Sequence, residues 1–246
     1  MVTYYGHLDD AYREYPEKLS ALIRSLRPKR VVEIGGGANP SIPLATVAEL
    51  GISEYSVLDI SEAELSKAPA GYRKVVADIC ADQPIAGGYD FVFSRFLAEH
   101  IPNAQTFHRN IYRMLNPGGI AFHFFPTMFS SVYVLNVLIP ERVGQAILAR
   151  LDSERRQEGH AGKFRAYYRW CRGPVMRQVE RFHRLGYEIE EYSGFFVYYY
   201  WDKFPLLGKL HRIKTRLLMK HPIPALTSLA WLILRKPLSQ GYANAN

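Results

Sequence analysis

Short apolar runs alternate along the first half of the chain with stretches of helical period. Five runs have the length and the β-branched or aromatic content of buried strands. They lie at 31–34, 55–60, 74–79, 89–94 and 120–125. Apolar residues at helical spacing precede or separate them, over 16–26, 42–50, 61–68 and 103–115. This alternation predicts a parallel, doubly wound α/β sheet, because a helix carries the chain back before each parallel strand.

The second half of the chain adds two further strands and two insertions. Residues 187–192 alternate as a sixth strand, and residues 229–237 form an apolar seventh. Residues 127–173 and 202–222 lie outside the strand and helix pattern of the sheet. We expect one domain over 1–246, in which residues 1–28 form a helical cap that packs on the sheet.

The first strand runs directly into three glycines, in residues 31–40 (VVEIGGGANP). Glycine allows a sharp turn and lets a ligand lie against the backbone. A glycine-rich turn between a strand and a helix is how α/β folds hold nucleotide-like ligands. The loop lacks the Lys-Ser/Thr pair of a phosphate-binding P-loop. It also places Pro40 where the dinucleotide fingerprint requires Gly or Ala.

Three acidic residues end three successive strands: Glu33, Asp59 and Asp78. Parallel strands end at a common edge of the sheet, so we expect these carboxylates at one edge. An acid at the end of the second strand is typical of a ribose site, since a carboxylate can accept hydrogen bonds from both hydroxyls. Any one of these acids could instead be a helix cap or a surface charge.

In this order, the motifs resemble those of class I S-adenosylmethionine (SAM) methyltransferases of the type 11 group. Residues 33–39 (EIGGGAN) are similar to motif I, with Asn39 at the place of the third glycine. Residues 97–100 (LAEH) resemble the family's L-E-H segment with an alanine inserted. Residues 113–119 (RMLNPGG) resemble its R-x-L-x-P-G-G turn. The resemblance, close over 28–126, implies a Rossmann-like, seven-stranded, mostly parallel sheet whose last strand is antiparallel.

The resemblance also implies SAM as cofactor, with S-adenosylhomocysteine as product, and it assigns roles. The glycine loop approaches the methionine part, an acid grips the ribose, and residues after strands three and four bound the adenine and the reacting region. The expected cofactor-binding residues are Glu33, Gly35, Gly36, Gly37, Asp59, Ile60, Asp78, Ile79, Ser94 and Arg95. His100 is the candidate catalytic base, although a lone histidine is more often structural. No metal site is expected, because the two cysteines form no metal-binding motif.

A formal net charge of +8 predicts an acidic partner, which could be nucleic acid, an anionic membrane or an acidic substrate. Enzymes that methylate base amino groups usually carry N/D-P-P-Y/F after strand four, where this chain reads SRFL (94–97). RNA cytosine C5 enzymes need a cysteine there. These absences argue against methylation of nucleic-acid bases. In this family the insertion after strand five forms a substrate lid, so we assign 127–173 that role.

The lid and the aromatic run 195–201 favour a small-molecule, sugar or lipid-linked acceptor, with oxygen as the expected methylated atom. In 202–222, Leu206, Leu210, Ile213 and Leu217 follow helical spacing, Leu207 and Leu218 widen the stripe, and basic residues fill the other faces. The stripe could pack on the domain, or residues 195–222 could dock on an anionic membrane.

No apolar run could span a bilayer and no secretory signal is present, so we expect a cytoplasmic protein, with peripheral contact at the inner membrane face. Two other functions stay open. One is an RNA- or protein-modifying methyltransferase, which the net charge permits. The other is a non-catalytic membrane- or partner-binding module on the same fold. The oligomeric state is left open.

Overall fold

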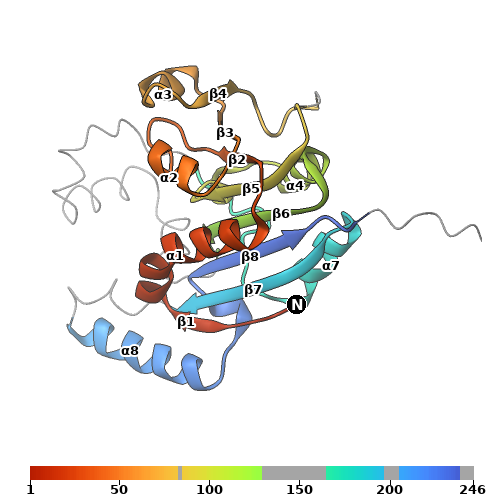
Figure 1. The fold of residues 1–246 in the computed structure, drawn as a ribbon. Helices are drawn as coiled ribbons and strands as arrows, with labels where there is room; N and C mark the ends of the chain where they lie inside the picture. Colours follow the sequence, from red (N-terminus) through yellow and green to blue (C-terminus); the bar gives the residue numbers. More distant parts are fainter. Residues whose placement is uncertain (83–84, 129–164, 197–204, 239–246) are drawn as a thin grey trace, which may run out of the picture.

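The computed structural model describes residues 1–82, 85–128, 165–196 and 205–238 (Figure 1). These residues build one eight-stranded sheet with the strand order β1-β7-β8-β6-β5-β2-β3-β4. Its strands are β1 (Tyr5–His7), β2 (Arg30–Ile34), β3 (Glu54–Asp59), β4 (Arg73–Val76), β5 (Tyr89–Arg95), β6 (Leu115–Pro126), β7 (Glu188–Phe196) and β8 (Leu229–Arg235). Strand β8 runs antiparallel to β6 and β7, and the other pairs are parallel. The predicted doubly wound, mostly parallel sheet is confirmed.

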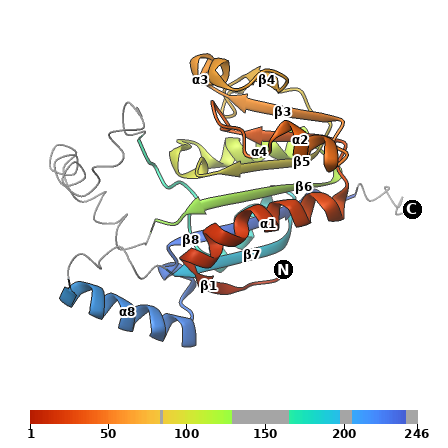
Figure 2. The same ribbon diagram turned by 60° about the vertical axis from the view of Figure 1, so that its left-hand side comes forward.

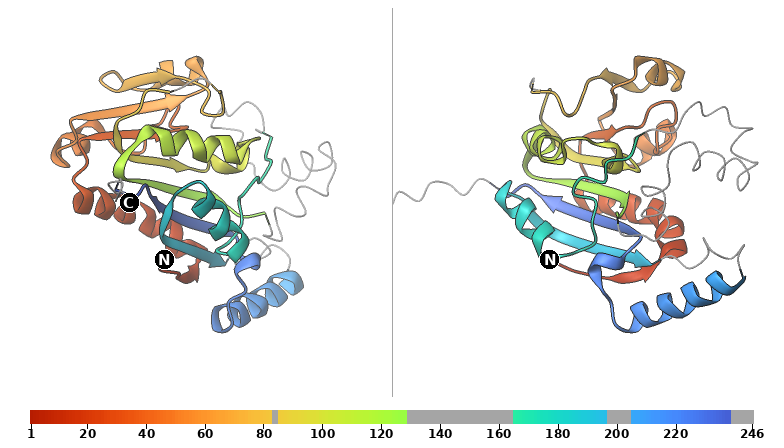
Figure 3. Two further views of the ribbon diagram at one scale, coloured as in Figure 1. Left: turned by 90° about the vertical axis from the view of Figure 1, so that its right-hand side faces the viewer. Right: turned by 180° about the vertical axis from the view of Figure 1, so that it is seen from behind.

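Helices cover both faces of the sheet. They are α1 (Leu8–Leu26), α2 (Leu44–Glu49), α3 (Glu62–Lys67), α4 (Ala104–Met114), α7 (Met176–Arg184) and α8 (Pro205–Lys220), with short 3-10 turns η1 (Ala98–His100) and η2 (Pro224–Leu226). Buried side chains of α1, α2 and α3 form a first core with one face of the sheet, and those of α4 and α7 form a second core with the other face. Figure 2 shows α1 across the first face, and Figure 3 shows α4 and α7 on the second.

The expected count of seven strands is one too low, because the N-terminal segment adds β1. Tyr5–His7 pairs in parallel with residues 194–196 at the edge of β7. Three residues with a central glycine carry no readable alternation of apolar and polar positions. The strand therefore exists through its pairing with β7, which a local pattern cannot reveal.

The first helix begins at Leu8, eight residues before the start that Pro16 suggested. Proline inside a helix removes one backbone hydrogen bond and crowds the preceding turn. Helix α1 continues through Pro16 because its apolar residues pack against the sheet, where Ala11, Tyr15 and Ile23 are almost fully buried. Tertiary packing therefore outweighs the local penalty.

Two buried histidines lie in the second core. The Nδ1 atom of His123, on β6, lies 2.8 Å from the Oγ atom of Ser94 on β5. The rings of His108, on α4, and His123 meet edge to face with centroids 5.2 Å apart. Burial lowers the pKa of His123 to about 3 and also lowers that of His108. Both imidazoles are therefore neutral in the folded protein at neutral pH.

We predict that acid destabilises the fold through these histidines. Unfolded histidine has a pKa near 6.5, so between pH 6.5 and about 3 the unfolded chain binds protons that the folded protein excludes. The free energy of unfolding should then fall as pH falls, by up to about 1.4 kcal/mol per pH unit for each histidine. Urea denaturation at several pH values should show a shallower dependence for His123→Gln. The exposed His221 gives the matched control, His221→Gln, and equal slopes in all three proteins would contradict the prediction.

Candidate functional site

The glycine loop lies at the point where the sheet changes direction. From β2 the chain proceeds to β3 and β4 on one side, and then crosses to β5 on the other side of β2. In open α/β sheets, ligands bind outside the carboxyl ends of the strands at this switch point. Pairing places Ile34 of β2 level with Leu58 of β3 and Ser94 of β5, so the residues after these positions share one edge.

Two glycines give the loop its shape. Gly35 and Gly37 have φ angles of +78° and +46°, a left-handed conformation that costs other residues free energy. The backbone N–H of Gly35 donates to the carbonyl of Leu58, with an N···O distance of 2.7 Å. Asn39 donates its N–H to the carbonyl of Gly36 and has no positive φ. The missing third glycine of the motif therefore imposes no backbone strain at Asn39.

Glu33 holds this loop from inside the protein. Its side chain is buried, and one carboxylate oxygen accepts hydrogen bonds from the backbone N–H of Ser41, at 2.8 Å, and from the hydroxyl of Tyr55. The other oxygen accepts from the hydroxyl of Ser41. Burial raises the pKa of Glu33, and the hydrogen bonds from Ser41 and Tyr55 oppose that rise. Both oxygens are thus engaged by the protein, and Glu33 shapes the site through the loop.

Asp59 lies beside the loop at the end of β3. One of its oxygens, Oδ1, accepts the N–H of Ser61 at 2.9 Å. The other, Oδ2, points at Gly37, where an added Cβ would lie 3.4 Å from it. The next residue, Ile60, is 69% exposed, which is unusual for an isoleucine beside a packed strand. The loop, a carboxylate oxygen and an exposed apolar side chain therefore come together here.

Asp78 and Ile79 follow β4, which ends at Val76, earlier than expected. Asp78 is exposed, and its Oδ1 atom accepts the N–H of Cys80 at 2.8 Å. Ile79 is buried in the second core, and the side-chain amide of Asn110 on α4 donates to its carbonyl at 2.8 Å. Asp78 therefore lies at the edge of the sheet, whereas the side chain of Ile79 points into the protein.

Ser94 and Arg95 end β5 with opposite orientations. Ser94 is buried, and its hydroxyl meets His123 in the core, so it is turned away from the edge. Arg95 is exposed, and its guanidinium carbon lies 5.2 Å from the ring centroid of Tyr15. The next residue, Phe96, has a φ angle of +51°, a strained conformation of the kind that occurs at functional sites.

The segment 97–100 joins this edge to the glycine loop. An added Cβ on Gly35 would lie 2.9 Å from the Cδ1 atom of Leu97, so the two residues are in close contact. Turn η1 then places Glu99 and His100 side by side, with 3.8 Å between the Oε1 atom of Glu99 and the Nε2 atom of His100. The other ring nitrogen of His100, Nδ1, lies 3.0 Å from the carbonyl of Arg165.

Glu99 is a candidate site residue that sequence reasoning missed. Glu99 is only 5% exposed, and its Oε2 atom has no hydrogen-bond partner among the residues that the structure describes. Burial raises its pKa to about 8. A buried carboxyl with a free oxygen and a shifted pKa is typical of functional sites. The motif at 97–100 contained the signal, but the sequence does not reveal that Glu99 is buried.

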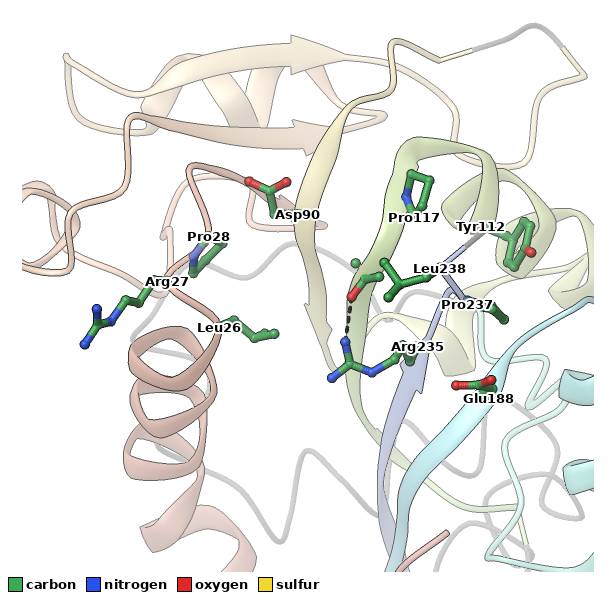
Figure 4. Close-up of a pocket in the computed structure, with 12 residues that line it drawn as sticks. Leu26, Arg27, Pro28, Asp90, Tyr112, Pro117, Glu188, Arg235, Pro237 and Leu238 are labelled. Atoms are coloured by element: carbon green, nitrogen blue, oxygen red, sulfur yellow. Dashed lines mark hydrogen bonds between the residues drawn. The ribbon is translucent and has the colours of Figure 1, made fainter. Parts of the chain in front are cut away.

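A hollow of about 1150 Å³ lies at the opposite ends of the strands (Figure 4). Two of its charged residues, Asp90 and Arg235, are already engaged by the protein. Asp90 accepts hydrogen bonds from the backbone N–H groups of Lys29 and Arg30, and Arg235 donates to the carbonyl of Gly118 at 2.7 Å. It shares none of the predicted site residues. The candidate site is therefore the one at the carboxyl edge.

Comparison with known proteins identifies the family. Residues 4–189, most of the chain, match the family described as "Methyltransferase domain". This chain belongs to that methyltransferase family. The predicted enzyme class is confirmed, and the predicted fold agrees with the family and with its solved relatives. A search of the curated proteins found no match to this methyltransferase.

Two solved structures illustrate the similarity. An S-adenosylmethionine-dependent methyltransferase from Mesorhizobium loti has 16% identity and a TM-score of 0.54, over 87% of this chain and 96% of that chain. Phosphoethanolamine N-methyltransferase 2 from Haemonchus contortus, solved with S-adenosyl-L-methionine, has 17% identity and a TM-score of 0.52. That match covers 89% of this methyltransferase and 52% of the other chain. At these identities the likeness concerns the fold.

We predict that Gly35→Ala destabilises this methyltransferase more than Gly51→Ala does. Both glycines have positive φ angles, +78° and +68°, so alanine is strained by about 1–2 kcal/mol at either position. Only at Gly35 would the new methyl group also meet a side chain, that of Leu97, whereas nothing lies within 4 Å at Gly51. Overpacking should add about 1–3 kcal/mol, measured as the free energy of urea unfolding.

The double variant Gly35→Ala/Leu97→Ala separates the steric cost at Gly35 from the backbone strain. In the Leu97→Ala background, the added methyl group at Gly35 no longer meets a side chain. The loss of unfolding free energy caused by Gly35→Ala in that background should therefore equal the loss caused by Gly51→Ala, which comes from backbone strain alone. Equal losses of stability for the two single glycine variants would show that Leu97 does not press on the loop.

Proposed function

We propose that this methyltransferase transfers a methyl group from SAM to a hydroxyl oxygen of a small, lipid-linked acceptor, and that Glu99 takes the proton from that hydroxyl. The observation that carries the proposal is the buried carboxyl of Glu99, which lies two residues after Leu97, the residue that contacts the glycine loop. Peripheral contact of the protein with a membrane is argued separately below.

The donor side of the site fits SAM. This cofactor supplies a methyl group activated by the positive charge of its sulfonium sulfur. The left-handed turns at Gly35 and Gly37 would bring the loop backbone against the methionine part. The Oδ2 atom of Asp59, beside Gly37, would accept hydrogen bonds from the ribose hydroxyls, and the exposed Ile60 would pack on the adenine ring. Asp78, exposed at the same edge, can accept from the adenine amino group.

The acceptor side needs a base, because a neutral hydroxyl is a weak nucleophile. Bound SAM would supply the methyl group to the acceptor oxygen, and its sulfur would keep the electron pair of the carbon–sulfur bond. The hydroxyl proton would pass to the Oε2 atom of Glu99, which is buried and has no hydrogen-bond partner among the described residues, so acceptor binding would have to uncover this atom. His100, whose Nε2 atom lies 3.8 Å from Oε1 of Glu99, is placed to orient this carboxylate. His100 is thus a positioning residue in this proposal.

The preference for a lipid-linked acceptor rests on the surroundings of the site. The connections after β6 and β7 both leave the sheet at the carboxyl edge. The second of them contains α8, which carries exposed leucines and basic residues. The predicted lid, residues 127–173, lies mostly outside the described residues. Its described part is tied to the site, because Tyr167 and Tyr168 donate their N–H groups to the carbonyl of Glu99.

We predict that label from methyl-labelled SAM appears in the lipid fraction when the protein is incubated with a cell extract that contains membranes. Asp59→Ala should transfer no label, because the carboxylate that would bind the ribose hydroxyls of SAM is lost. Its circular dichroism spectrum should stay unchanged. Asp82→Ala removes an exposed acid elsewhere and serves as the control. Label in RNA or protein would instead support a macromolecular acceptor. Unchanged transfer by Asp59→Ala would overturn the donor placement.

We predict that turnover rises as pH passes about 8, because the base form of Glu99 is its carboxylate, which is populated above its pKa. Glu99→Gln should lose this rise and fall by about 10²–10⁴-fold in kcat, with SAM affinity retained. The exposed Glu180 gives the control variant Glu180→Gln. A normal rate and pH profile in Glu99→Gln would assign Glu99 a purely structural role.

A further inference from the structure

Helix α8 lies at the same edge of the sheet as the site. Strand β7 ends at Phe196 on the carboxyl edge, and the antiparallel β8 must begin there, at Leu229. Helix α8 belongs to this connection. Figures 1 and 2 show it beyond β1, the strand at one edge of the sheet. Its position leaves one side of the helix to the protein and the other to the surroundings.

The side of α8 that faces the protein consists of small and polar residues with one leucine. Gly208, His211, Thr215 and Leu218 are buried, at a spacing of three, four and three residues. Such spacing places them on one face of the helix. The helix contacts β7. Leu218, which the sequence suggested would widen the outer stripe, belongs to this inner face.

The opposite side of α8 is an exposed apolar stripe. Leu206, Leu210, Ile213 and Leu217 are 72%, 56%, 45% and 58% exposed, respectively. Their spacing of four, three and four residues aligns them along one face. These four side chains are therefore not packed on the domain. A continuous row of exposed large aliphatic side chains indicates an interaction surface.

The charges of α8 indicate what the stripe contacts. The helix carries five basic residues and no acidic residue, and these are Lys209, Arg212, Lys214, Arg216 and Lys220. Lys209, Arg216 and Lys220 share a spacing of seven and four residues, which aligns them along one border of the stripe. A hollow of about 450 Å³ adjoins the same border, lined by His7, Ile213, Arg216, Leu217, Met219 and Lys220. This combination of an aliphatic face and a cationic border matches an anionic lipid surface.

We propose that α8 docks this methyltransferase on an anionic membrane surface. The stripe enters the boundary between headgroups and acyl chains, and the cations along its border meet lipid phosphates. A second copy of the chain fits less well, because a two-fold contact through α8 would bring two sets of five cations together. Among the described residues no helix is long and apolar enough to cross a bilayer.

Sedimentation with vesicles tests this surface. The full chain is mixed with vesicles of phosphatidylcholine alone or of an equimolar mixture with phosphatidylglycerol. We expect binding to the mixed vesicles that weakens as salt is raised. The double variant Leu210→Asp/Arg216→Glu should bind on the order of 100-fold more weakly, at roughly fivefold per unit of charge. Binding requires no turnover, so this result is independent of the proposed acceptor.

The matched control is Met176→Asp/Arg177→Glu, which makes the same change of charge at two exposed residues of α7. It should bind the mixed vesicles as the unaltered protein does. Circular dichroism spectra are recorded for both double variants to check that they are folded. An equal loss in the control would show that net charge, and not α8, drives binding, which overturns the proposal.

Two further outcomes would assign the stripe to another occupant. One is a chain that ignores vesicles and forms a dimer that the α8 variant converts to monomers. The other is a chain that binds vesicles only after deletion of residues 129–164, which would mean that this segment covers the stripe. Either outcome overturns membrane docking by the intact protein.

Discussion

One buried carboxylate fixes the loop on which the site depends. A charged group inside a protein loses its hydration, and it is retained only where hydrogen bonds replace the lost water. Glu33 receives that replacement from β3, through Tyr55, and from the far end of the loop, through Ser41. A single side chain therefore ties β2, β3 and the loop together. The left-handed turns at Gly35 and Gly37 are held in place because both ends of the loop are anchored.

The sequence predicted those parts of the fold that depend on a pattern within a short stretch of the chain. The central strands are apolar because they are buried on both faces, and the acids and glycines follow them at fixed offsets. Strand β1 could not be predicted, since three residues around Gly6 acquire their structure from pairing with β7. The start of α1 was hidden for a similar reason, because packing of Ala11 and Tyr15 carries the helix through Pro16.

The candidate site could also be predicted only in part from the sequence. Sequence position locates a residue at the edge of the sheet, but the direction of its side chain depends on the exact strand end and on tertiary packing. Asp59 points at the loop, whereas Ser94 bonds to His123 and Ile79 enters the core. Glu99 could not be recognised for the same reason, because its distinctive property is burial without a partner for one oxygen.

Helix α8 shows how far a periodic pattern alone can lead. Its spacing predicts a stripe but not which side of the helix meets the protein, and only the structure places the aliphatic row outside. That orientation also bears on where the carboxyl edge of the sheet would lie relative to a membrane. A helix that rests in a membrane surface would hold the carboxyl edge near the headgroups, so a lipid-linked acceptor could reach Glu99 without leaving the bilayer. The free-energy cost of exposing the apolar part of the acceptor to water would then be avoided, because the protein and its acceptor would share one interface.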